Sequence, residues 1–474
     1  MNAILLLAIV KFAAPFTDGA VLQRETKVPV WGTADAGEQV TVAFAGQTKT
    51  ATAAADGRWR VDLDPMDACC EGRTLTANGV AVRDVLVGEV WLCSGQSNMG
   101  VPFWGESPRA RERLGASFGQ ILDLPLLRCA GLGNKWSDTP QTEERVRWQK
   151  TTPKFCLEGG FSAVAIWYGY YLQTTLKIPV GLLGAYVGGT DIETWIPDCK
   201  FEPPPRCAAT VGLGQGPSQF HNGKVNPVVP YAMRGAIWYQ GESNTESLET
   251  IAGYGARMKA LHDGWRRVFE NPRFKLYFCQ LCPWGSRIGP QMQEVQQKFA
   301  QEEPDAGMAV LCDVGNICDI HPNDKQTPGL RLALLALKRD YGFSDIIADS
   351  PTLKAWKIED GKFVMSFNDA KVWALYDPDW RILRDPSKSV EYGFEVAGAD
   401  GKWVKAQIGN IRRLATKPPS DYREYRGQID GEDLVVWSDE VKEPKKLRYL
   451  HSRPWRGYLM NEAGLPLGAF HIGE

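Results

Sequence analysis

The fold of this chain is indicated first by residues 85–99, which read VLVGEVWLCSGQSNM. Val85–Cys93 is a nearly continuous apolar run, and such runs are typical of strands buried on both faces of a parallel sheet. The polar segment Ser94–Met99 follows at once, so Ser97 is expected where the strand ends. Ligands of open parallel sheets bind beyond the carboxyl ends of the strands, and a site is therefore expected here.

The rest of the middle of the chain alternates between strand and helix patterns. Buried strands are expected at residues 179–187, 235–239, 274–280 and 308–313, and helices with apolar residues at helical spacing at 160–176, 256–269 and 330–341. This alternation predicts an α/β fold in which helices cover both faces of a mainly parallel sheet. Residues 100–155 lack clear periodicity and are interpreted as long connections.

Both ends of the chain have a different, β-rich pattern. Residues 27–31, 39–44 and 59–63 alternate apolar and polar side chains between turns, which predicts a small β-sandwich. Short strand patterns return after residue 350 and predict a second one. The expected domains are residues 12–85, 86–345 and 346–474, the first and last being β-sandwich regions.

Composition excludes some function classes. The 474 residues carry a formal net charge of −2, which disfavours broad binding to nucleic acid or anionic membranes. No apolar run reaches the roughly 18 residues of a membrane-spanning helix, so no transmembrane segment is expected. Residues 3–10 (AILLLAIV) fit either the apolar part of a signal peptide or a first strand. The oligomeric state is not indicated.

The eleven cysteines include one C-x-x-C pair, Cys279 and Cys282, within an apolar stretch. No second pair completes a zinc set, so buried thiols are the preferred interpretation and intracellular thiol or zinc chemistry the alternative.

Four segments that follow expected strands carry polar groups or bare backbone. A serine nucleophile needs a base, usually histidine, and donors for an oxyanion. Ser97 is the candidate nucleophile. Gly188 and Gly189, whose N–H groups can approach a carbonyl oxygen closely, and the side-chain amide of Gln240 are the candidate oxyanion donors. Taken alone, the glycine pair is better interpreted as a plain turn. The segments are Ser94–Met99, Gly188–Thr190, Gln240–Asn244 and Asp319–Pro322.

Five histidines compete for the role of the base. His321 follows a sheet strand and is the best placed, although it could instead cap the next helix. His262 is expected on the surface of its helix, His221 in a loop that could line a cleft, and His451 and His471 in the C-terminal β region. Asp319 can orient the imidazole of His321; the other candidates for that role are Asp313, Asp324 and Glu242.

Taken together, these motifs resemble those of the sialate O-acetylesterases, members of the SGNH (GDSL-like) hydrolase superfamily. They are GQSNM at 95–99, GGT at 188–190, WYQGESN at 238–244 and DIHP at 319–322. VLQR at 21–24 and VPVWG at 28–32 resemble the N-terminal β-domain of that family, and residues 394–401 and 464–466 its C-terminal part, so the resemblance covers nearly the whole chain.

The resemblance implies a three-layer α/β/α domain between β-sandwich regions and an enzyme that hydrolyses O-acetyl esters of carbohydrate. Ser97 would be the nucleophile, His321 the base and Asp319 the acid, with oxyanion donors from Ser97, Gly188 or Gly189, and Gln240. Glu242 and Asn244 would support the site. No metal or organic cofactor is implied, and the expected location is outside the cytoplasm: periplasmic, secreted or lumenal.

Departures from the family pattern leave alternatives open. Asp319 stands two residues before His321, where the superfamily often has three, so a Ser–His dyad is the alternative to a triad. His221, a short loop between Trp195 and Asn222, and the segment Leu450–Tyr458 also differ from the usual pattern. Sialic acid is the first expected sugar and acetylated xylan or another polysaccharide the second. A catalytically silent carbohydrate-binding protein is the alternative of another class.

Overall fold

The structure is a computed structural model. It describes residues 10–103, 122–133, 136–204, 216–284, 289–315, 319–376, 393–409, 411–413, 425–429, 432–451 and 459–473. The chain divides into two compact units: unit 1 comprises residues 1–243, 256–277 and 323–333, and unit 2 comprises residues 244–255, 278–322 and 334–474. Each unit is described by itself.

Unit 1 begins with short antiparallel strands. Their side chains alternate between buried and exposed, as in β6, because successive side chains of a strand point to opposite faces. One sheet has the order β1-β3-β6, while β4 pairs with β5 and β7, and β7 pairs with β8. The bounds are β1 (Lys11–Phe12), β2 (Val21–Gln23), β3 (Val28–Thr33), β4 (Gln39–Phe44), β5 (Gln47–Thr52), β6 (Arg58–Leu63), β7 (Cys69–Ala77) and β8 (Val80–Gly95).

Strand β8 continues from these strands into the central sheet. Its first half pairs antiparallel with β7, whereas Glu89–Gly95 pairs parallel with β11 and Trp91–Gly95 parallel with β12. The order is β10-β9-β11-β8-β12-β13, with β10 antiparallel to β9. The sheet is therefore mixed, with a parallel core. The further bounds are β9 (Leu124–Gly131), β10 (Gln149–Thr151), β11 (Val180–Tyr186), β12 (Gly235–Tyr239) and β13 (Lys275–Cys279).

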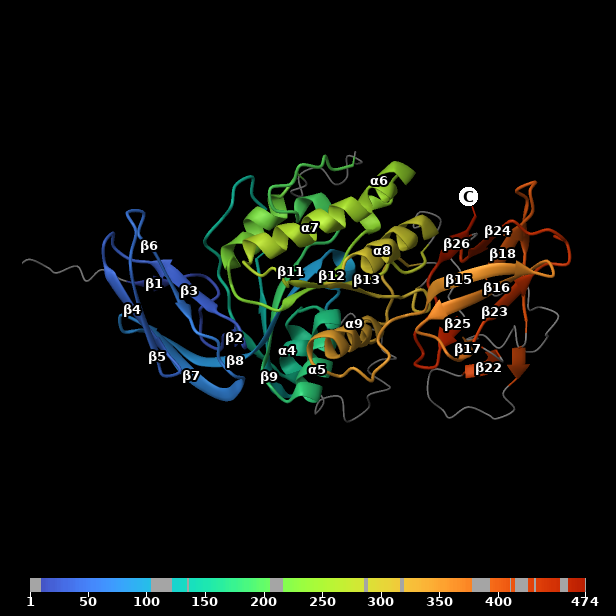
Figure 1. The fold of residues 1–474 in the computed structure, drawn as a ribbon. Coiled ribbons are helices and arrows are strands. Elements are labelled where there is room, and N and C mark those ends of the chain that lie inside the picture. The colour runs from blue at the N-terminus through green and yellow to red at the C-terminus, as the bar shows by residue number, and fades with distance from the viewer. Residues whose placement is uncertain are drawn as a thin grey trace, which may run out of the picture. The chain divides into compact units, whose positions relative to one another are not determined.

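Helices pack on this sheet through aromatic side chains. Tyr168 of α5 (Ala163–Leu176) meets Trp91 of β8 edge-on at a ring distance of 5.5 Å, and Trp265 of α7 (Tyr254–Val268) meets Trp238 of β12 at 5.7 Å. Figure 1 shows α7 above and α5 below the strands β11 and β12. Ser162 caps α5 by accepting a hydrogen bond from the Ala165 N–H. Helices α1 (Ser97–Gly100) and α4 (Pro153–Glu158) and the first part of α9 (Gln326–Asp340) also belong to this unit.

Unit 2 contains α6 (Leu248–Ala252), α8 (Pro290–Glu302), β14 (Ala306–Ala309), the end of α9 and the C-terminal strands. These strands form three four-stranded sheets with the orders β15-β16-β23-β20, β21-β22-β17-β25 and β19-β18-β24-β26. Their bounds are β15 (Thr352–Glu359), β16 (Lys362–Asn368), β17 (Trp373–Tyr376), β18 (Phe394–Ala397), β19 (Trp403–Lys405), β20 (Gln407–Ile408), β21 (Ile411–Arg413), β22 (Tyr425–Ile429), β23 (Leu434–Trp437), β24 (Lys446–Tyr449), β25 (Leu459–Asn461) and β26 (Phe470–Ile472).

The α/β class is confirmed, and one sequence interpretation is corrected. Residues 124–131, expected as part of a long connection, form β9, which pairs parallel with β11. The strand pattern is obscured by Arg128, which is buried because its guanidinium bonds Asp84 at 2.9 Å and the Pro125 carbonyl at 2.7 Å. The predicted boundaries 12–85, 86–345 and 346–474 stay predictions. Residues 3–9 of the apolar N-terminal segment lie outside the described residues.

No helix in the described ranges is long and apolar enough to cross a bilayer.

A buried carboxylate holds β8 at the point where its pairing changes. Glu89 is fully buried, and its Oε1 lies 2.6 Å from Nε of Arg24 and 2.9 Å from Nη2 of Arg234. Its Oε2 accepts a hydrogen bond from Gln23 at 3.0 Å. Burial alone would raise the pKa of Glu89, but the bonds from Arg234 and Arg24 outweigh it and lower the pKa below its ordinary value.

We expect Glu89→Gln to lower the free energy of unfolding by about 3–5 kcal/mol, because it leaves two arginines facing a neutral buried partner. The folded pKa of Glu89 lies below its unfolded value. Its contribution is therefore present above pH of about 4.5 and is lost as the pH falls through the folded pKa. Denaturant unfolding from pH 7 down to pH 3 measures both effects, and the difference between the two proteins should shrink in acid.

Glu25→Gln is the matched control. Glu25 contacts the same two arginines, at 2.9 and 3.4 Å, but is half exposed, so about 0–1 kcal/mol is expected. Equal effects of the two substitutions would contradict the role of the buried carboxylate.

Candidate active site

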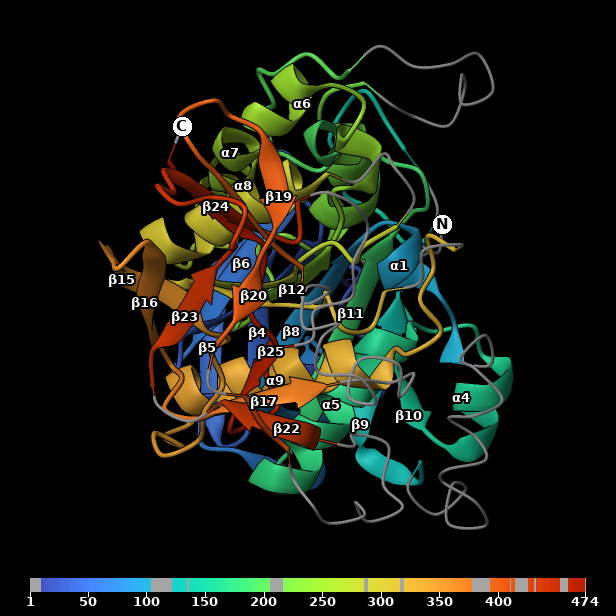
Figure 2. The same ribbon diagram turned by 90° about the vertical axis from the view of Figure 1, so that its right-hand side faces the viewer.

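Ser97 lies at the carboxyl end of β8, as the sequence predicts. It is the first residue of the short helix α1, which lies beside the ends of β8, β11 and β12 (Figure 2). Gly95, at the turn, has φ +136°, and a Cβ there would stand 2.2 Å from the Tyr239 carbonyl oxygen. Because no side chain fits in that space, the turn that presents Ser97 requires glycine.

The glycine pair after β11 comes close to Ser97. A Cβ added at Gly188 would lie 3.3 Å from Cβ of Ser97, so this backbone passes directly beside the serine. Thr190 closes the turn by donating a hydrogen bond to the Val187 carbonyl at 2.9 Å, and Nε1 of Trp195 donates to Oγ1 of Thr190 at 2.9 Å. Hydrogen bonds through Thr190 therefore hold this turn in place.

Gln240 is fully buried at the end of β12. Its Nε2 donates to the Thr190 carbonyl at 3.0 Å, which ties the turn after β12 to the turn after β11. The structure therefore gathers Ser97, Gly188, Gly189 and Gln240 at one edge of the sheet of unit 1.

A buried polar chain connects the residue next to Ser97 with two charged groups. Nζ of Lys325 donates to Oδ1 of Asn98 at 2.6 Å, and Nδ2 of Asn98 donates to Oε1 of Glu242 at 2.5 Å. Lys325 and Asn98 are almost completely buried. Burial raises the pKa of Glu242, while the hydrogen bond from Asn98 and the charge of Lys325 act in the opposite direction. These hydrogen bonds between Lys325, Asn98 and Glu242 hold the start of α1 against the 3-10 turn η7 (Glu242–Asn244), in which Asn244 is buried.

Asp319 and His321 lie together in unit 2. Oδ1 of Asp319 accepts a hydrogen bond from the backbone N–H of His321 at 2.9 Å and lies 3.7 Å from its Nδ1. The two side chains are 50% and 42% exposed. The two-residue spacing therefore permits a carboxylate–imidazole contact. Among the other candidate acids, Asp324 caps α9 by accepting hydrogen bonds from the N–H and hydroxyl of Thr327.

Four histidines remain. The predicted surface position of His262 is wrong: it is fully buried on α7, and its Nε2 lies 2.6 Å from the Phe274 carbonyl. It follows Met258 by four residues and so shares the apolar face of the helix. His221 is buried, and burial lowers its pKa to about 4, so it is neutral at pH 7. His451 and His471 both bond Glu294.

Sequence reasoning missed Lys325 and gave Asn98 no role. A single lysine after the DIHP motif carries no recognisable pattern. The only signal is its position, four residues beyond His321 and at the start of a helix. The C-x-x-C cysteines are buried, as predicted.

Comparison with known proteins finds carbohydrate esterases. The family model described as carbohydrate esterase, sialic acid-specific acetylesterase, matches residues 139–310. The sialate O-acetylesterase of Rattus norvegicus is 27% identical over 476 residues, which cover 85% of each chain. That of Homo sapiens is 29% identical over 388 residues, covering 72% of this chain and 73% of the human one.

A similar solved structure is also that of a carbohydrate esterase. The carbohydrate acetylesterase from Xanthomonas citri superposes with a TM-score of 0.81 at 28% identity, covering 98% of this chain and 99% of that one. The comparisons confirm the predicted resemblance to the sialate O-acetylesterases and the predicted class of the protein, an esterase of carbohydrate esters.

We expect Lys325→Met to lower esterase kcat by about tenfold to a hundredfold, because Asn98 loses its anchor and the start of α1 can shift beside Ser97. Steady-state kinetics and thermal unfolding of the variant measure the two effects separately. Lys150→Met, at a lysine that is 54% exposed, is the control and should behave as wild type. A variant that unfolds more easily while its folded fraction keeps full kcat would reduce the role of Lys325 to stability.

Proposed function

We propose that this chain removes O-acetyl groups from a carbohydrate, with sialic acid as the expected sugar, through an acetyl-enzyme formed on Ser97. The observation that carries the proposal is the position of Ser97. It stands on a turn that requires glycine, at the carboxyl end of a central strand, with the backbone of Gly188 beside it. Such an arrangement offers a nucleophile and N–H donors at one place.

The proposed steps follow from these groups. Oγ of Ser97 attacks the acetyl carbonyl carbon while His321 accepts the hydroxyl proton. N–H groups of Ser97 and of Gly188 or Gly189, together with the Gln240 amide, stabilise the oxyanion. The C–O bond to the sugar breaks, and the sugar oxygen takes the proton from His321. Water then gives a proton to His321 and attacks the acetyl carbonyl carbon. The bond from that carbon to Oγ of Ser97 breaks, Oγ takes the proton from His321, and acetic acid leaves and ionises to acetate.

Gln240 is proposed as an oxyanion donor because its amide has a fixed orientation. Its Nε2 donates to the Thr190 carbonyl at 3.0 Å, which fixes the plane of the amide beside the turn after β11. A donor held in this way needs little reorganisation as charge develops on the substrate. The Lys325–Asn98–Glu242 chain is proposed to position Ser97 and not to touch the substrate; in this scheme Glu242 and Asn244 act as site support.

The proposal also includes the finer fold and the place of action. We assign an SGNH-type three-layer α/β/α domain flanked by β-sandwich regions, on the basis of the parallel core of the central sheet and the similarity to the Xanthomonas citri enzyme. By resemblance to the sialate O-acetylesterases, we place the protein outside the cytoplasm. An O-acetylated carbohydrate is its expected partner.

We expect Ser97→Ala to abolish hydrolysis of 4-nitrophenyl acetate while leaving the circular dichroism spectrum unchanged, since only the attacking oxygen is removed. Acetate release from O-acetylated sialic acid and from acetylated xylan, measured at equal acetyl concentration, then identifies the sugar. Hydrolysis that is equal in wild type and variant would contradict the serine mechanism. An inactive wild type that still binds the sugars would favour a silent carbohydrate-binding protein.

The choice between triad and dyad depends on Asp319. If its carboxylate orients His321 and stabilises the imidazolium, Asp319→Asn should reduce kcat by up to about 10⁴-fold. Kinetics of Asp319→Asn beside Asp324→Asn, which alters a helix cap, measure the difference. A loss of less than about threefold at Asp319 would favour a Ser–His dyad.

A further inference from the structure

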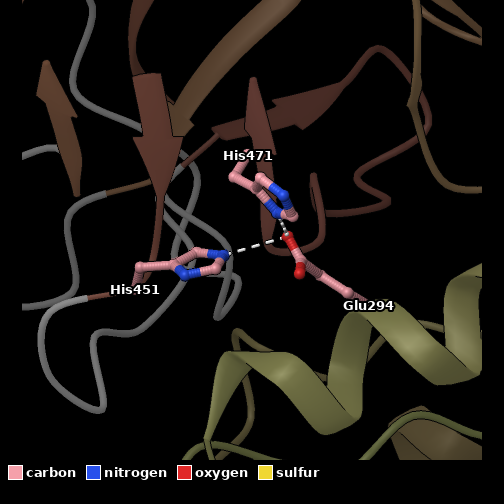
Figure 3. Close-up of side chains that lie close together, drawn as sticks. All are labelled: Glu294, His451 and His471. Atoms are coloured by element: carbon pink, nitrogen blue, oxygen red, sulfur yellow. Dashed lines mark hydrogen bonds and ion pairs between the residues drawn. The ribbon is translucent and has the colours of Figure 1, made fainter. Parts of the chain in front are cut away.

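Two histidines and a glutamate of unit 2, none of which takes part in the proposed mechanism, converge on one point (Figure 3). Nε2 of His451 lies 3.0 Å and Nδ1 of His471 lies 2.7 Å from the same oxygen, Oε1 of Glu294. The three side chains come from different elements: α8, β26 and the residues just after β24. In the described part of the chain, no other group of three or more His, Cys, Asp or Glu side chains converges in this way.

We propose that Glu294, His451 and His471 bind a late first-row divalent cation such as Zn²⁺. Imidazole nitrogen and carboxylate oxygen are ligands that Zn²⁺ accepts, and a set of two histidines and one glutamate leaves a fourth position for water. Mg²⁺ prefers oxygen ligands and is not expected to bind.

The spacing of the donor atoms suits such an ion. Zinc bonds of about 2.0–2.2 Å place the ligands of a tetrahedral site roughly 3.3–3.5 Å apart. The two nitrogen–oxygen separations, 3.0 and 2.7 Å, are shorter than this by about 0.3–0.8 Å, and the rings of the two histidines lie 5.7 Å apart. Small outward movements of the side chains would therefore admit an ion where the hydrogen bonds now lie.

The backbone around the three residues is held firmly. Strands β24 and β26 pair antiparallel, with Arg448 opposite His471. Helix α8 is tied by buried glutamines: Nε2 of Gln293 donates to the Leu281 carbonyl at 2.8 Å, and Oε1 of Gln296 accepts from the Leu281 N–H at 3.0 Å. Ligands on supported elements lose less conformational entropy when a metal binds.

The access of the site also fits. Oε1 of Glu294 already bonds both histidines, so one oxygen faces the two nitrogen donors. His451 is 11% exposed and His471 is 53% exposed, which leaves a path for the ion from solvent. His451 also lies in the segment whose sequence departs from the usual family pattern.

Zinc binding to the purified full-length chain tests the proposal. After incubation with Zn²⁺ and gel filtration, elemental analysis should give about one zinc per wild-type chain. His471→Ala, at an exposed side chain, should fold normally and lose at least about tenfold in zinc affinity by titration calorimetry. Glu294→Gln should do the same, whereas Glu302→Gln, at a 66% exposed residue of the same helix, should bind as wild type does.

Two further measurements exclude other binding modes. Zinc at a hundred times its dissociation constant should raise the midpoint of thermal unfolding of wild type by about 5 °C or more, with no rise in His471→Ala and none with Mg²⁺. Co²⁺ should show visible bands without the near-ultraviolet charge-transfer band of a thiolate. Zinc that stays bound in the double variant Glu294→Gln/His471→Ala, or that never binds wild type, would overturn the proposal.

Discussion

The buried carboxylate of Glu89 is the interaction on which the structure of unit 1 depends. Strand β8 has to serve two sheets: it pairs antiparallel with β7 along its first half and parallel with β11 and β12 along its second. Glu89 lies where the pairing changes. Its carboxylate bonds the side chains of Gln23 in β2, Arg24 just after β2 and Arg234 just before β12. A charge can stay in such a place because arginines compensate its desolvation.

The position of Ser97 follows from that strand. Once β8 is fixed along its axis, its last residues meet the ends of β11 and β12, and the two neighbouring turns come within contact of the serine. Gly95 permits an approach of backbone to backbone that any side chain would prevent, and a Cβ at Gly188 would lie only 3.3 Å from Cβ of Ser97. The Thr190 side chain closes its own turn, and the side chains of Gln240 and Asn98 bond neighbouring turns to one another. The position of Ser97 therefore results from main-chain packing, and the hydrogen bonds between the turns maintain it.

The strands that sequence patterns could predict are those with an uninterrupted apolar run. Residues 235–239 were expected as a strand and form β12 with the same bounds, because a polar residue stands on each side of the run. Strand β9 escaped prediction because Pro125 and Arg128 interrupt its pattern, and a sequence does not reveal that Arg128 has a buried partner in Asp84. The candidate residues of the site could be predicted from motifs at strand ends. Lys325 could not be predicted in this way, because it acts only through its hydrogen bond to Asn98, which the sequence does not reveal.

The double use of β8 limits how this protein can be divided. Val80–Val87 forms the partner of β7, and Leu86–Gly88 the partner of β2, within the same strand that carries the turn of Ser97. A protein truncated before residue 80 would lack β2 and β7, so the first half of β8 would have no strand to pair with. The exposed strand edge would favour aggregation. The N-terminal β-strands are therefore not a detachable module that evolution or an engineer could exchange freely. Recombination with another protein would have to take the N-terminal strands and the turn that carries Ser97 together.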